Sequence, residues 1–141
     1  MKKIWYILLI MLTLSACSSQ TVIPADTENT QAENVTMLDE GAWPVNTYTD
    51  GLPIPPGTVS WAVLDTEHEN CSISLVDLNE TDYDNYMELL KQEGFFVIGD
   101  TSEEIKGENY ISIGTILSNG EKGLSISYIP NNFTIYISFV E

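Results

Sequence analysis

The chain has 141 residues, with 21 acidic residues against 5 lysines and no arginine, and its formal net charge at pH 7 is −16. Nucleic-acid binding relies on clustered lysine or arginine, so this composition argues against a nucleic-acid partner. The same charge repels anionic lipid head groups and anionic wall polymers.

A lipobox follows a short apolar run at the start of the chain. Two lysines precede residues 4–12, which are too few to form a membrane-spanning helix. The run leads into Leu14-Ser15-Ala16-Cys17. We predict that residues 1–16 are a lipoprotein signal peptide that is removed, and that Cys17 carries the lipid. The mature protein is therefore expected on the outer face of a bacterial cell membrane, held by the lipid anchor on Cys17, with a net charge of about −18 once the two lysines are lost.

The next segment, residues 17–42, is predicted to be the lipidated cysteine and a flexible tether. Its residues are mainly polar and have little to bury, apart from Val35, Met37 and Leu38, which are able to dock as a short segment. A single domain is predicted for residues 43–141. Its proline-rich entry, residues 43–56, is expected to lie on the domain as an extended strap.

The rest of the chain alternates with the period of half-buried strands. Val59, Trp61 and Val63 are expected to share one face, and residues 65–70 are expected to form a hairpin turn. The strands are predicted at residues 59–63, 71–76, 95–98, 110–117, 124–129 and 133–140.

One helix interrupts this pattern. Asn79 or Thr81 is its predicted cap, and Gly94 its predicted end. Its apolar stripe recurs at intervals of three and four residues: Tyr83, Tyr86, Met87 and Leu90. The expected fold class is α+β, with one mostly antiparallel sheet of about five to six strands and a single helix packed on one face.

The alternate residues of the predicted strands make a second face with almost no charge. They are Ser60, Ala62, Ser72, Ser74, Tyr110, Ser112, Gly114, Gly123, Ser125, Ser127, Thr134, Tyr136 and Ser138. A water-facing sheet usually carries lysine and glutamate. Either small residues with high strand propensity suffice here, or the strap covers the face, or the face binds a protein or glycan partner. In the last case, the binding face is expected to include Ser74, Tyr110, Ser112, Ser127 and Tyr136.

Few residues suggest catalytic or metal chemistry. His68 is the only histidine and is expected to be solvated in a turn, and no nucleophile motif is present. Asp65, Glu67 and Glu69 alternate in that turn and are weak candidates for a divalent cation site. Cys71 is the only thiol left after lipidation and is predicted to be a buried apolar residue. We expect no cofactor and no catalytic residues.

Three motifs resemble a group of small lipoproteins of low-GC Gram-positive bacteria. They are Trp43-Pro44, Leu52-Pro53-Ile54-Pro55 and Leu90-Lys91-Gln92-Glu93-Gly94-Phe95. The resemblance implies architecture and location but carries no catalytic residue onto this chain. The sequence thus favours a membrane-tethered, non-enzymatic module that binds or scaffolds. The alternatives are a small hydrolase or carbohydrate-active protein of the cell envelope, and a divalent-cation-binding domain.

Overall fold

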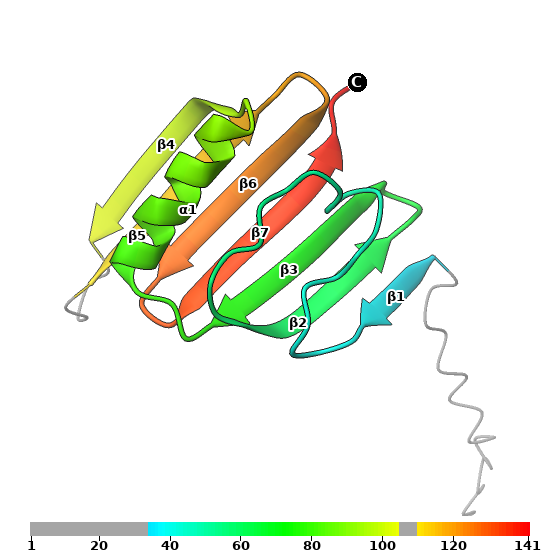
Figure 1. Ribbon diagram of the computed structural model, residues 1–141, viewed down its shortest axis with the longest axis horizontal. Coiled ribbons are helices and arrows are strands. Elements are labelled where there is room, and N and C mark those ends of the chain that lie inside the picture. The colour runs from blue at the N-terminus through cyan, green and yellow to red at the C-terminus, as the bar shows by residue number, and fades with distance from the viewer. Residues whose placement is uncertain (1–33, 105–109) are drawn as a thin grey trace, which may run out of the picture.

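The computed structural model describes residues 34–104 and 110–141, which form one sheet and one helix (Figure 1). All neighbouring strands are antiparallel, and seven strands follow the order β1-β2-β3-β7-β6-β5-β4. The α+β class is therefore as predicted, whereas the expected strand number of five to six is too low. The predicted signal peptide, Cys17 and most of the tether lie outside the described residues. The elements are β1 (Val35–Leu38), β2 (Thr58–Asp65), β3 (Asn70–Val76), α1 (Glu80–Gln92), β4 (Phe96–Glu104), β5 (Ile111–Ser118), β6 (Lys122–Ile129) and β7 (Asn132–Phe139).

The extra strand, β1, lies in the segment assigned to the tether. It pairs with β2 along its whole length. Leu38 also packs against the core, and the backbone amide of Thr66 donates to the carbonyl oxygen of Asn34 at 2.8 Å. The folded domain thus begins before the boundary predicted at Trp43, because this short segment gains both ladder hydrogen bonds and apolar contact.

A crossover sets the order of the strands. β3 lies between β2 and β7, and α1 carries the chain from β3 to β4 at the far edge of the sheet (Figure 1). The chain then returns through β5 and β6 until β7 pairs with β3. The last three strands, β5, β6 and β7, therefore form an antiparallel meander, and β1 and β4 are the two edges of the sheet.

The helix α1 begins and ends where the sequence indicates. The side chain of Asn79 accepts from the backbone amide of Asp82 at 3.1 Å, and the Asp82 carboxylate accepts from the amide of Asn79 at 3.0 Å. This reciprocal pair satisfies two amide groups that the helix itself leaves without partners. Gly94 has a φ of 90°, the left-handed conformation that favours glycine after a helix. The predicted stripe is buried: Tyr83, Tyr86, Met87 and Leu90.

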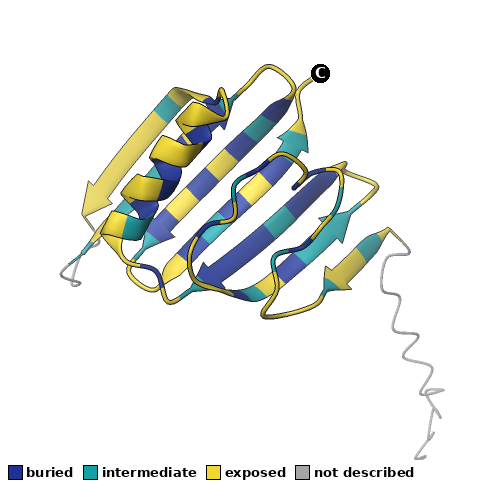
Figure 2. Ribbon diagram, in the orientation of Figure 1, coloured by how far each residue is buried: buried dark blue, intermediate teal, exposed yellow. Residues whose placement is uncertain are grey.

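The strap packs on the same face of the sheet as α1 (Figures 1 and 2). The ring of Tyr48 lies 5.0 Å from that of Phe139, and the Asn46 amide nitrogen lies 3.6 Å from the sulfur of Cys71. Helix and strap therefore share one face of the sheet. The strap does not cover the second face, so covering by the strap does not explain why that face is uncharged.

The core lies between the sheet and these two covering elements (Figure 2). Tyr86 of α1 meets Phe133 edge-on, with ring centroids 5.7 Å apart. Cys71 is fully buried, as predicted. The sheet contributes Val59, Ala62, Cys71, Ile73, Leu75, Leu117, Leu124, Ile126, Tyr128, Phe133, Ile135 and Ile137.

A bulge in β2 changes which of its residues face the core. The register shifts between Val59 and Trp61, so that Val59 and Ala62 are buried while Trp61 is 38% exposed. An extra residue in a bulge reverses the alternation beyond it. The expectation that Val59, Trp61 and Val63 share one face is therefore wrong, as is the place of Ala62 on the second face.

A second bulge lets β4 run further than predicted. The register shifts between Val97 and Gly99, and the strand continues to Glu104, whereas the sequence suggests an end at Ile98. The polar residues that read as a loop pair with β5 instead, because an edge strand exposes its side chains to water and tolerates polar ones.

Candidate functional site

The side of the sheet opposite α1 and the strap carries two uncharged rows of side chains. Direct strand partners define each row, because partners in an antiparallel ladder lie on the same face. We call these two rows the open face. Asp65 and Glu103 are charged and lie in the rows beyond it. The first row is Met37, Val63, Ser72, Tyr136, Ser125, Ile116 and Gly99, and the second is Trp61, Ser74, Thr134, Ser127, Gly114 and Thr101.

Two aromatic side chains give the open face its exposed flat surface. Trp61 is 38% and Tyr136 41% exposed, and Ile116 adds an exposed aliphatic side chain. Trp61 and Tyr136 stand two strands and one row apart, so ideal sheet spacing separates their Cα atoms by about 12 Å. Short hydroxyl side chains occupy the positions between them: Ser72, Ser74 and Thr134.

A depression of about 290 Å³ lies on the open face near β4 and β5. Its lining combines five residues of the open face with two whose side chains lie on the helix side, Asp100 and Thr115. The five are Gly99, Thr101, Gly114, Ile116 and Ser125. A Cβ atom at Gly114 would lie 2.9 Å from the hydroxyl oxygen of Thr101, so any larger residue at this position forces the threonine to move. Glycine inside a strand weakens the strand and is typical of places where another group approaches the backbone closely.

Three of the five predicted binding residues belong to the open face. Ser74, Ser127 and Tyr136 lie in its two rows, although neighbouring side chains bury Ser74. Ser112 lies in the next row, opposite Glu103. The sequence missed Trp61 because nothing in the alternation of β2 marks the bulge that turns this residue outward.

Tyr110, the fifth predicted residue, lies elsewhere. It precedes β5 and lines a recess on the helix side of the sheet, together with Glu80, Ile113 and Tyr128. Ile113 and Tyr128 are partners in the ladder and face the core. Tyr110 is outside the strand, so the alternation of β5 does not determine its direction.

Two of the three carboxylates in the acidic turn between β2 and β3 accept hydrogen bonds. Asp65 accepts from the backbone amides of Glu67 and His68, each at 3.0 Å, and one of its oxygens lies 2.8 Å from Nδ1 of the imidazole. The backbone and ring of His68 lower the pKa of Asp65. Glu67 accepts from the side chain of Asn34 at 3.2 Å. Within residues 34–104 and 110–141, no three His, Cys, Asp or Glu residues form a group that could hold a metal ion. This holds for the candidate ligands Asp65, Glu67 and Glu69 as well.

The single described thiol is held in an unreactive state. Burial raises the pKa of Cys71, and the side chain of Asn46 opposes this effect only in part. A thiol with a raised pKa is a poor nucleophile because it forms little thiolate. His68, by contrast, is exposed on its turn and is engaged with Asp65.

The comparisons with known proteins bear on the N-terminus. Residues 1–18 match the model of a prokaryotic membrane lipoprotein lipid attachment site. The protein is therefore a lipoprotein, anchored at the outer face of the cell membrane through the cysteine of this site, Cys17, which precedes the described residues. No curated protein matches the chain. No helix of the described residues combines the length and hydrophobicity of a membrane span.

Proposed function

We propose that this lipoprotein is a non-enzymatic binding module whose open face takes an uncharged glycan of the cell envelope. The observation that supports it is the uncharged, aromatic-bearing open face in a chain with a net charge of −16. Helix and strap cover the other face, so no described element shields this one from a ligand.

Charge and surface chemistry favour a neutral sugar chain as the occupant. The acidic remainder of the molecule repels anionic polymers, whereas an uncharged glycan meets no repulsion. The apolar faces of sugar rings stack on aromatic rings, and sugar hydroxyls pair with serine and threonine. The distance of about 12 Å between Trp61 and Tyr136 is one that a short oligosaccharide spans.

Titration calorimetry with uncharged oligosaccharides tests this proposal. The lipidated protein, held in phosphatidylcholine nanodiscs, is titrated separately with hexamers of N-acetylglucosamine, glucose and mannose. We expect at least one of them to bind, and the double variant Trp61→Ala with Tyr136→Ala to lose that binding by at least about tenfold. Val45→Ala, a change at an exposed residue of the strap, should bind as the wild type does.

Two results would contradict the glycan proposal. One is the lack of binding of all three hexamers at about 10 mM, a concentration that detects even weak sugar binding. The other is equal binding by the double variant, which would place the sugar elsewhere on the molecule. A third outcome would point to a protein partner on this face instead. In that case the wild type captures a protein, and the double variant does not.

A further inference from the structure

β4 ends the sheet with a long edge. Its residues Phe96–Glu104 pair with β5 on one side, and no strand of the described residues pairs with the other side. The opposite edge strand, β1, has only 4 residues. Edge strands expose a row of backbone donors and acceptors to which another strand can add.

Apolar side chains are exposed along the first half of β4. Phe96 is 57% and Ile98 60% exposed, and Val97 between them is exposed too. A run of three exposed apolar residues on an unpaired edge invites association unless it serves a function. The second half of the strand is acidic instead, with Asp100, Glu103 and Glu104.

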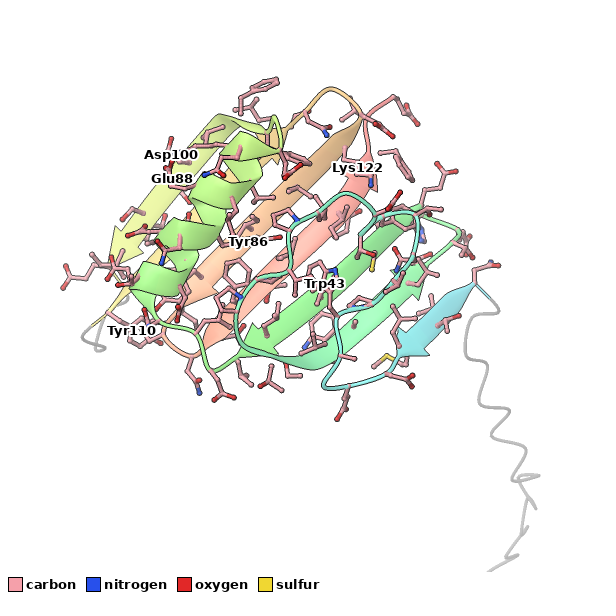
Figure 3. All side chains as sticks on the ribbon, in the orientation of Figure 1. Trp43, Tyr86, Glu88, Asp100, Tyr110 and Lys122 are labelled. Carbon is pink, nitrogen blue, oxygen red and sulfur yellow. The ribbon has the colours of Figure 1, made fainter. Side chains whose placement is uncertain are left out.

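A groove of about 340 Å³ lies between α1 and β4, where Figure 3 shows Glu88 close to Asp100. The hydroxyl groups of Tyr83 and Thr115, both of which line it, lie 2.7 Å apart. Lys91, which also lines the groove, engages the Glu88 carboxylate at 2.6 Å, so these two charges offset each other. Within the described residues, no ion pair involves the other two acids of the groove, Asp84 and Asp100.

The register shows how an added strand would meet this groove. Val97 and Asp100 stand opposite Leu117 and Thr115, which are buried under α1, so both side chains lie on the helix side of β4. Side chains of an added strand alternate between the two sides of the sheet. Every second one would therefore lie on the helix side, and those nearest Asp100 would meet the groove, where a cation is favoured across the strands.

From these observations we propose that the edge of β4 is a strand-addition site for an extended segment of a partner protein, with lysine or arginine at alternate positions. The backbone of the segment pairs with β4, its cations lie beside Asp84 and Asp100, and its other side chains cover Phe96. This site borders the open face, whose rows end at Gly99 and Thr101 of β4, but it does not depend on the glycan proposal.

A second copy of the chain does not suit this edge. Asp100 is the midpoint of β4, so a full antiparallel pairing of two such strands brings the two Asp100 side chains together. Like charges directly opposite in a ladder are destabilising. Acidic residues and a bulge are also the features by which edge strands avoid self-association. The same charges attract a basic segment, which gives the site its selectivity.

Four peptides test the proposal on the lipidated protein in phosphatidylcholine nanodiscs. The probe is an acetylated and amidated heptapeptide of alternating lysine and valine. One control peptide has glutamate in place of lysine. The other two keep lysine but are N-methylated at alternate backbone positions, one along each edge of the extended peptide. We expect the probe to bind at least about tenfold more tightly than the glutamate peptide and than one of the two N-methylated peptides, because only the peptide edge that faces β4 needs free amides. Amide hydrogen exchange should slow in Phe96–Glu104 on binding and stay unchanged in β1.

Variants of the protein test whether Asp84 and Asp100 attract the lysines of the probe. Asp84→Lys with Asp100→Lys should weaken binding of the probe at least about tenfold, whereas Asp39→Lys, beside the opposite edge, should change it by less than about twofold. The proposal is overturned if the probe fails to bind at about 1 mM, if the glutamate peptide or both N-methylated peptides bind as tightly, or if exchange slows elsewhere than in β4. Each peptide result is obtained on the wild-type protein and so stands even if the double variant folds poorly.

Discussion

The ammonium group of Lys122 donates a hydrogen bond to the backbone carbonyl oxygen of Asp50, which joins the start of β6 to the strap. Lys122 is only 7% exposed, and its nitrogen lies 5.9 Å from the centre of the Phe139 ring. A cation over an aromatic face is stabilised by the ring as well as by its hydrogen bond. One of the few basic residues of this acidic protein thus holds the strap against the sheet.

Replacing Lys122 should therefore loosen the strap. We expect Lys122→Met to lower the free energy of unfolding by about 1–3 kcal/mol, because it removes the hydrogen bond to Asp50 and leaves a partly buried carbonyl without its donor. Lys91→Met is the matched control, since Lys91 forms only an exposed pair with Glu88 and should change the free energy by less than about 1 kcal/mol. Urea denaturation of both variants measures the difference, and equal stabilities would show that Lys122 does not hold the strap.

The turn between the strap and β2 depends on a glycine. Gly57 has a φ of 106°, and a Cβ atom there would lie 2.6 Å from the carbonyl oxygen of Val76 and even closer to the side chain of Leu78. We expect Gly57→Ala to cost more than about 2 kcal/mol of stability, from backbone strain and from the clash together. Gly51→Ala has a similar φ but open space around it and should cost only about 1 kcal/mol. Thermal unfolding distinguishes the two, and similar losses would indicate that strain alone matters.

The single histidine reports on its turn. The hydrogen bond to Asp65 raises the pKa of His68 above its ordinary value of 6.5. In turn, the backbone amide and ring of His68 lower the pKa of Asp65. The contribution of His68 to stability is thus fully present below pH 6.5 and is lost as the pH rises through its folded pKa. That of Asp65 is present above its unfolded value of 3.8 and is lost as the pH falls through its folded pKa.

An NMR titration of the imidazole protons checks this pair. We expect a midpoint above 6.5 in the wild type and a return toward 6.5 in Asp65→Asn, because the carboxylate that stabilises the imidazolium is gone. Glu121→Gln removes an acid from a different turn and serves as the control. An unchanged midpoint in Asp65→Asn would show that the pair does not form in solution.

Anchoring depends on Cys17. Cys17→Ser removes the thiol that receives the lipid in the matched attachment site, so the variant should fail to incorporate a clickable fatty acid in cells. Cys71→Ser keeps that site intact and should label as the wild type does. Labelling of Cys17→Ser at the wild-type level would contradict lipid attachment at this residue.

Local features of the fold could be predicted from the sequence, and long-range ones could not. The cap at Asn79, the stripe of α1 and the glycine at its end each depend on residues within a few positions of one another, so their spacing was sufficient. The alternation of β5, β6 and β7 also placed Ser127 and Tyr136 on the correct face. These signals come from residues whose neighbours in sequence determine their environment.

The errors arose where distant segments meet. β1 is a strand only because β2 offers it a ladder, and residues 43–56 lie beside α1 because Lys122 and Phe139 hold them there. The bulge that exposes Trp61 adds one residue to β2 without a glycine or proline to mark it. The binding face predicted from the sequence accordingly shares Ser74, Ser127 and Tyr136 with the open face but lacks Trp61, the largest aromatic side chain there.

The tether enters the fold at β1, and β4 lies six strand spacings away, about 29 Å across the sheet. Tension between the lipid and a partner on β4 would therefore act across the ladder, so that hydrogen bonds open one after another instead of shearing together. β1 has 4 residues and pairs only with β2, which makes it the first strand to detach under load. Its release would lengthen the connection to the membrane while the strands that carry Trp61 and Tyr136 stay paired.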